Sequence, residues 1–280
     1  MSNPPTPGVV PVAVHRFGGA GHPTLFAHAT GFHGGVWGPL AAELGDGYEC
    51  FAFDERGHGN TPPPADGNFD WDGFAIDALS AVDDLGLVCP FGVGHSAGAV
   101  ALLLAELARP GTFSALFCYE PVIFPFEGRV MPPGEHPLTV GARKRREVFA
   151  SRNEAFDNFA SKPPLEVLRP DALRAYVDYG MEDLATGEVR LKCRGENEAK
   201  VYAMSSRHRT YERLAEIQCP VTLAGGELAD TFTPDIIRRQ AEPLRQGRVE
   251  ILEGLGHFGP LQDPVAVGAA VRRAFDPPAG

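Results

Sequence analysis

The sequence predicts an α/β protein with a doubly wound, mostly parallel sheet. Three observations point to this class: short apolar segments alternate with helical segments, a strand–turn–helix pattern surrounds residue 96, and one long helical interval interrupts the alternation. The predicted strands are residues 9–17 (a strand or a short hairpin), 24–29, 49–54, 88–93, 115–119, 221–224 and 249–252. The predicted core helices are 69–85, 99–108, 234–246 and 264–275.

The interval 122–213 departs from this alternation. It contains predicted helices at 139–150, 152–159, 170–181 and 196–206, and a segment at 188–193 that fits a short strand. When the interval is set aside, strand 221–224 follows strand 115–119 directly. We therefore expect a core formed by residues 1–121 and 214–280, with 122–213 as a helical cap, or lid.

Composition narrows the class of protein. The chain has 280 residues, of which 44% are hydrophobic and 22% charged, values typical of a soluble globular protein. Its first residues lack the features of a signal peptide, and four of its five cysteines lie on or beside predicted core strands, so we expect reduced thiols and a cytoplasmic location. The net charge of −11 argues against nucleic acid and membrane partners, which leaves a small-molecule substrate. A monomer and a homodimer both remain open.

The pattern Gly94-x-Ser96-x-Gly98 is the strongest sign of chemistry. An apolar strand precedes it and a run of helix formers follows it, which is the context of a nucleophile elbow. Such a turn strains the serine backbone and needs small flanking residues. The sequence therefore predicts Ser96 as a nucleophile, raised above the sheet at a helix N-terminus.

A serine nucleophile needs a base and an acid. His257 lies on a loop after the predicted strand 249–252, where α/β enzymes place their chemistry. In chain order the acid should fall between the serine and the histidine. We predict Asp230, on the loop after strand 221–224, with Glu120 and Glu227 as the alternatives.

With these residues the chain resembles the α/β-hydrolase superfamily over nearly its whole length. Residues 53–61 (FDERGHGNT) are similar to the D-x-R-G-x-G-x-[ST] turn of that family. The resemblance implies that the aspartate and arginine of this turn tie loops together without taking part in chemistry. It also implies that an insertion after the sixth strand forms a lid that shapes the substrate site.

Residues 25–35 (LFAHATGFHGG) resemble the loop that supplies half of the family's oxyanion hole, but two registers are open. Aligning Gly31 makes the Phe32 amide the donor, and aligning His28 makes Thr30 the nearer candidate. We prefer Phe32, because the preceding glycine permits close backbone approach. The second donor is expected to be the Ala97 amide.

No metal or organic cofactor is expected. His28 and His33 lack accompanying ligands at metal-binding spacing, so we expect them to pack and brace the loop.

Several aromatic residues are candidates for an apolar substrate pocket. We predict substrate contacts from Trp37, Phe124, Phe126 and Phe149. The basic run Arg143, Lys144, Arg145 and Arg146 is interpreted as a solvated helix face, because consecutive helical positions point in different directions.

These features predict a serine hydrolase that cleaves a carboxylic ester or lactone of a small, largely apolar substrate through an acyl-enzyme. The resemblance leaves two alternatives with the same triad, a C–C bond hydrolase and a cofactor-free haloperoxidase. A small-molecule receptor built on this fold is the alternative from another class.

Overall fold

The computed structural model describes residues 8–124, 137–204 and 207–275, and it has the predicted α/β architecture. A seven-stranded sheet runs in the order β1-β3-β2-β4-β5-β9-β10. All neighbouring pairs are parallel except β1 and β3, which are antiparallel. The strands are β1 (Val14–Gly18), β2 (His22–Ala27), β3 (Tyr48–Phe53), β4 (Phe91–His95), β5 (Ala115–Tyr119), β9 (Val221–Gly226) and β10 (Gly247–Leu252).

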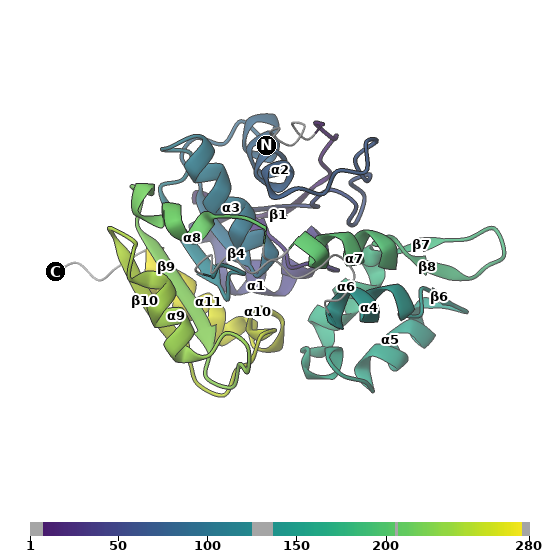
Figure 1. The fold of residues 1–280 in the computed structure, drawn as a ribbon. Helices are drawn as coiled ribbons and strands as arrows, with labels where there is room; N and C mark the ends of the chain where they lie inside the picture. The colour runs from purple at the N-terminus through teal and green to yellow at the C-terminus, as the bar shows by residue number, and fades with distance from the viewer. Residues whose placement is uncertain (1–7, 125–136, 205–206, 276–280) are drawn as a thin grey trace.

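Helices cover both faces of this sheet (Figure 1). Helices α1 (Gly38–Leu44) and α11 (Pro264–Phe275) pack into one apolar layer; α2 (Trp71–Asp84), α3 (Ala97–Ala108) and α9 (Pro234–Ala241) pack into the other. Successive strand residues contribute to opposite layers, as strand geometry requires: Phe26 lies in the first, and Leu25 and Ala27 in the second. The strands are therefore apolar on both faces, which explains the uninterrupted apolar segments in the sequence.

Most of the segment between β5 and β9 forms a separate lobe beside the sheet (Figure 1). The lobe contains α4 (Pro137–Lys144), β6 (Val148–Phe149), α5 (Arg152–Ala160), η3 (Leu165–Val167), α6 (Pro170–Gly180), β7 (Met181–Asp183), β8 (Val189–Leu191) and α7 (Gly195–Met204). The short helices α8 (Thr210–Arg213) and η4 (Leu214–Glu216) follow the lobe and pack on the core, where α8 lies beside α3. Strands β6, β8 and β7 form a small antiparallel sheet.

Two predictions about this segment need correction. The predicted helix 139–150 ends at Lys144, because the chain turns there and Val148 and Phe149 pair with β8. The insertion also follows the fifth strand of the sheet, not the sixth, because the described N-terminal residues form one strand and not a hairpin.

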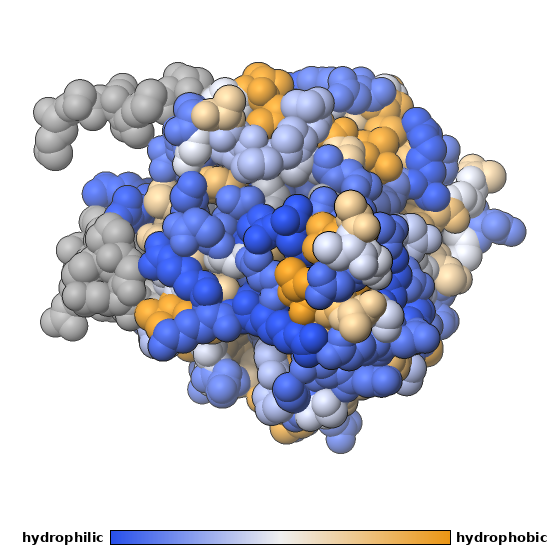
Figure 2. Space-filling view, turned by 90° about the vertical axis from the view of Figure 1, so that its right-hand side faces the viewer, coloured by the Kyte–Doolittle hydropathy of each residue, from blue (hydrophilic) through white to orange (hydrophobic). Residues whose placement is uncertain are grey.

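The remaining short helices join core elements: η1 (Gly34–Trp37) leads into α1, η2 (Gly45–Gly47) leads into β3, and α10 (Gly259–Gln262) precedes α11. Within the described residues, no helix combines the length and apolar character needed to cross a membrane. Figure 2 views the molecule from the side of the inserted lobe, and this face is mainly hydrophilic with small, separate apolar areas.

Candidate active site

Ser96 occupies a strained turn between β4 and α3. Its backbone has φ 53° and ψ −113°, and its N–H donates to the carbonyl of Tyr119 at 2.9 Å. A Cβ at Gly94 would lie 2.4 Å from Ala99 Cα, and a Cβ at Gly98 would lie 2.3 Å from the carbonyl oxygen of Ala27. The predicted requirement for small residues on both sides of Ser96 is thus met by backbone contacts that leave no room for a side chain.

His257 reaches this edge of the sheet from the other end of the chain. Two side chains hold its loop: His95 Nε2 donates to the His257 carbonyl at 2.8 Å, and the Tyr119 hydroxyl donates to the Gly256 carbonyl at 2.8 Å. The rings of His95 and His257 lie 4.9 Å apart. Burial, with the nearby His257, keeps the pKa of His95 well below its usual value, so His95 is neutral and serves as a donor to the loop.

Glu120 is the carboxylate that contacts His257. Its Oε2 lies 2.6 Å from His257 Nδ1, and its Oε1 accepts the Gly226 N–H at 2.8 Å. The side chain is fully buried, and the residue has φ 44° directly after β5. Because a carboxylate only accepts, Nδ1 carries the proton in this pair and the lone pair of a neutral ring is on Nε2.

The preferred assignment of Asp230 to this position was wrong, and one of the alternatives fits. Asp230 is exposed and accepts from the hydroxyl of its neighbour Thr231, and the other alternative, Glu227, is exposed and accepts the Gly254 N–H. Glu120 follows β5 immediately, next to the strand that carries Ser96, whereas Asp230 lies beyond the end of β9. The position of Glu120 directly after a predicted core strand was the sequence feature that favoured it.

The loop after β9 brings an aromatic ring to His257 instead of a carboxylate. Phe232 is buried and stacks on His257, with the ring centroids 5.5 Å apart and an interplanar angle of 19°. Phe124 stacks on Phe232 in turn at 5.5 Å, and Phe258 packs edge-on to His257. Phe232 and Phe258 stand out in no sequence pattern, and their position beside His257 appears only in the fold.

The loop between β2 and η1 favours Thr30 over Phe32 as an oxyanion donor. The Phe32 N–H donates to the Ala29 carbonyl at 3.1 Å, and the Gly31 N–H donates to His58 Nε2 at 3.0 Å. Among the described residues the Thr30 N–H has no protein acceptor. In the preferred register the donor would be the Phe32 amide, which closes a turn, whereas the Thr30 amide of the alternative register has no such bond within the described residues. Gly31 makes the turn possible with φ 83°.

The histidines of this loop brace it, as expected from the sequence. His28 Nδ1 donates to the Ala29 carbonyl at 2.8 Å while Nε2 accepts the Glu55 N–H at 3.0 Å. His33 Nε2 donates to the Tyr176 carbonyl at 3.0 Å, which joins the loop to α6. Burial lowers the pKa of His28 to about 3 and that of His33 to about 4, so both rings are neutral.

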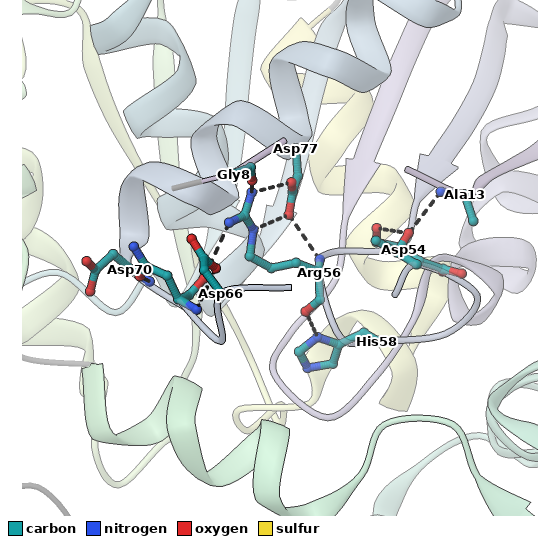
Figure 3. A network of polar contacts seen from close by, with 10 residues as sticks. Gly8, Ala13, Asp54, Arg56, His58, Asp66, Asp70 and Asp77 are labelled. Atoms are coloured by element: carbon teal, nitrogen blue, oxygen red, sulfur yellow. Dashed lines mark hydrogen bonds and ion pairs between the residues drawn. The ribbon is translucent and has the colours of Figure 1, made fainter. Parts of the chain in front are cut away.

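The turn 53–61 is a buried polar network (Figure 3). Arg56 forms a bidentate ion pair with Asp77, in which Nε donates at 2.9 Å and Nη2 donates at 2.8 Å. Asp54 accepts the N–H groups of Gly34 and Asn60. These contacts fix the turn against the oxyanion loop, in agreement with the loop-tying role that the resemblance implied.

Two of the four predicted substrate contacts belong to the core instead. Trp37 is 1% exposed and packs on Phe26, and Phe149 is fully buried against Phe159. Large aromatic side chains bury more apolar area in a core than in an open pocket, which is the physical reason for both corrections. Phe124 is 41% exposed and remains a candidate, whereas Phe126 lies outside the described residues.

The basic run at the end of α4 separates into two kinds of residue. Arg143 and Arg146 form exposed ion pairs with Glu196 and Glu154, as expected of a solvated face. Arg145 instead turns inward, donating to Glu198 at 2.5 Å and to the Tyr176 hydroxyl at 2.7 Å. Its charge is compensated inside the inserted lobe.

Comparison with known proteins agrees with this fold and with the resemblance seen in the sequence. A family model described as the alpha/beta hydrolase family matches residues 24–270, so the chain belongs to that family.

Karrikin insensitive 2 receptor B of Petunia hybrida is 33% identical over 105 residues, covering 35% of this chain and 37% of the receptor. The match thus spans little more than a third of that relative's length. A non-heme haloperoxidase of Rhodococcus erythropolis is 27% identical over 250 residues, covering 85% of this chain and 86% of that protein. The crystal structure of E-2-(acetamidomethylene)succinate hydrolase superimposes with a TM-score of 0.80 at 19% identity, covering 95% of this chain and 96% of that one, which shows a shared fold.

Proposed function

We propose that the protein is a serine hydrolase that cleaves a carboxylic ester or lactone of a small, largely apolar substrate. The observation that carries the proposal is the 2.6 Å contact between Glu120 and His257 beside the strained turn of Ser96. In this assignment Ser96 is the nucleophile, His257 the base and Glu120 the acid. Ser96 and Glu120 directly follow β4 and β5, and His257 lies on the loop after β10, so all three residues are at the carboxyl ends of parallel strands.

The reaction has two halves. Ser96 Oγ attacks the substrate carbonyl carbon while His257 Nε2 takes the hydroxyl proton, and the carbonyl electrons move to oxygen. The intermediate collapses, the bond to the alcohol breaks, and His257 returns its proton to the leaving oxygen. Water then repeats these steps on the acyl-enzyme, which releases the acid and restores Ser96.

Glu120 serves this cycle by holding His257 in the required tautomer. Its Oε2 accepts from Nδ1, and the Gly226 N–H fixes the carboxylate through Oε1. When His257 becomes an imidazolium, the buried carboxylate stabilises the positive charge.

The oxyanion is assigned to the amides of Thr30 and Ala97. Ala97 is the first residue of α3, so its N–H has no partner within the helix, and the Thr30 N–H has no acceptor among the described residues. One such donor is worth about 3 to 4 kcal/mol in the transition state.

The surroundings of His257 support an apolar substrate. The aromatic residues near the base are Phe32, Phe124, Phe232 and Phe258. They favour an uncharged, apolar substrate by contact. An alkoxide leaves more readily than an amine, which favours esters and lactones over amides.

Labelling and turnover test the proposal together. A fluorophosphonate probe should label Ser96, and the wild type should hydrolyse p-nitrophenyl esters of short acids. Ser96→Ala should abolish labelling and lower kcat by roughly 10⁴- to 10⁶-fold while the folded structure is retained. Near-normal turnover by this variant would refute the proposal, and binding of esters without repeated turnover would favour a receptor.

A second candidate is haloperoxidase activity, which the near full-length match to the Rhodococcus erythropolis protein favours. In this case hydrogen peroxide replaces water in the second half, attacks the acyl-enzyme and leaves as a peracid, which then oxidises halide. Measuring peracid and free acid from one ester, with and without peroxide, separates the two candidates. Hydrolysis that is unaffected by peroxide favours the first.

A further inference from the structure

We propose that His58 is a positioning residue of the oxyanion hole, which it controls by accepting the N–H of Gly31. The proposal rests on the serine hydrolase function above. It assigns a role in the chemistry to the turn 53–61, which otherwise only ties loops together.

The hydrogen bonds of His58 define its tautomer. Its Nδ1 lies 3.0 Å from the carbonyl oxygen of Arg56, which can only accept, so the ring proton is on Nδ1. Its Nε2 therefore offers a lone pair, which accepts the Gly31 N–H at 3.0 Å. Burial lowers the pKa of His58, which favours the neutral ring that this arrangement requires.

The turn that carries His58 is a rigid support. Arg56 is fully buried and paired with Asp77 (Figure 3). Asp54 accepts two backbone N–H groups, one of them from Gly34 at the start of η1. His58 is itself fully buried. A bond from this turn therefore places the Gly31 amide with little freedom.

The inserted lobe also contacts Gly31. A Cβ at Gly31 would lie 2.7 Å from Glu198 Oε1, so this carboxylate packs directly against the glycine. Glu198 is in turn fixed by Arg145. Gly31 is thus held by a hydrogen bond from the core and by packing against the lobe.

This geometry explains which amide is free to act. The bond to His58 uses the Gly31 N–H, and the bond to Ala29 uses the Phe32 N–H. Within the described part of the chain the Thr30 N–H remains unpaired beside them, and its direction depends on the placement of the next residue. Without the acceptor at residue 58, the Gly31 amide turns toward another acceptor and the Thr30 amide leaves its position.

Loss of the His58 acceptor should weaken stabilisation of the transition state more than it weakens substrate binding. The oxyanion forms only after Ser96 attacks, so a misplaced donor lowers kcat and leaves KM nearly unchanged. A residue that only stabilised the fold would not produce this separation.

A matched pair of variants isolates the acceptor. Gln and Met have similar shapes, but only Gln offers an oxygen to the Gly31 N–H, so His58→Gln and His58→Met are compared. We expect His58→Met to lower kcat by roughly 10- to 100-fold with KM within about twofold of wild type, and His58→Gln to recover most of that loss. His22→Ala, at the opposite end of β2, is the control with unchanged kinetics.

A trifluoromethyl ketone gives a second readout, because it becomes a tetrahedral oxyanion on the serine. Its affinity should fall in His58→Met by the same factor as kcat. Equal kcat and equal ketone affinity in the Gln and Met variants, or loss of folding in both, would overturn the role of His58. Failure of the wild type to turn over esters and bind the ketone would instead overturn the proposed function.

Discussion

Each carboxylate oxygen of Glu120 has its own partner, and this arrangement sets the chemistry expected of His257. Oε1 accepts the Gly226 N–H, while Oε2 faces His257 Nδ1. Because the carboxylate is buried and fixed by backbone, it cannot rotate away from the histidine. The two residues with unusual backbone at this edge, Ser96 and Glu120, both have positive φ and both follow a strand directly. Strain of this kind is typical of functional sites.

The first prediction separates Glu120 from the acid that the sequence favoured. Glu120→Gln keeps the shape of the side chain but can no longer stabilise an imidazolium, so we expect kcat for p-nitrophenyl acetate to fall about 10⁴-fold. Asp230→Asn, on an exposed residue, should stay within about twofold of wild type. A larger loss in Asp230→Asn than in Glu120→Gln would return the acid to the loop after β9.

At the scale of elements, the elbow depends on how closely α3 approaches β2. A Cβ at Gly98 would lie 2.3 Å from the Ala27 carbonyl oxygen and 2.6 Å from that of His28. Both are backbone atoms that cannot move without shifting β2 or the oxyanion loop. The same glycine therefore controls the packing of α3 and the position of the loop that carries Thr30.

The second prediction compares two glycine-to-alanine changes within helices. Gly98→Ala should lower the free energy of unfolding by roughly 1 to 3 kcal/mol through overpacking, as measured by urea unfolding, and it should also reduce kcat. Gly141 in α4 is exposed, and a Cβ at this position would have no neighbouring atom within 4 Å, so Gly141→Ala should stabilise by about 0.5 to 1 kcal/mol. Equal effects of the two changes would contradict the close approach of α3.

At the scale of the whole molecule, neutral histidines join the core, the turn 53–61 and the inserted lobe. His28 and His58 connect the oxyanion loop to the turn, and His33 connects it to α6. In each case one ring nitrogen donates to a carbonyl. In His28 and His58 the other nitrogen accepts a backbone N–H, so protonation would break that bond.

The third prediction follows from these buried rings. An unfolded histidine titrates near pH 6.5, whereas burial lowers the pKa of His33 to about 4 and that of His28 to about 3. Between about pH 6.5 and 4 the unfolded chain binds more protons than the folded one, so the free energy of unfolding falls as the pH falls. Above about pH 6.5 these histidines do not change the free energy of unfolding, because they are neutral in both states. As the pH falls toward the folded pKa values, the loss of free energy of unfolding grows.

Urea unfolding at about pH 7 and about pH 5 measures this effect, and His33→Gln should show a smaller decrease between the two pH values. A free energy of unfolding that does not change over this interval would contradict the neutral, buried state of these histidines.

Features that depend on neighbouring residues could be predicted from the chain. The alternation of strands and helices, the inserted segment and the elbow at Ser96 follow from local patterns, because strand period, helix propensity and the need for small residues at a sharp turn act over a few positions.

The partner of His257, the free amide of the oxyanion loop and the burial of the aromatic residues could not be predicted in this way. Each of them depends on residues that are distant in the sequence. Glu120, and not Asp230, makes the contact with His257, because β5 lies beside β4 and Glu120 follows β5 directly. We propose Thr30 in place of Phe32 as oxyanion donor because the Phe32 amide closes a turn, while residue 58 binds the Gly31 amide. Trp37 and Phe149 became core residues because only packing determines which aromatic side chains face solvent. Composition and local pattern cannot distinguish such alternatives, since they carry no information on which distant groups meet.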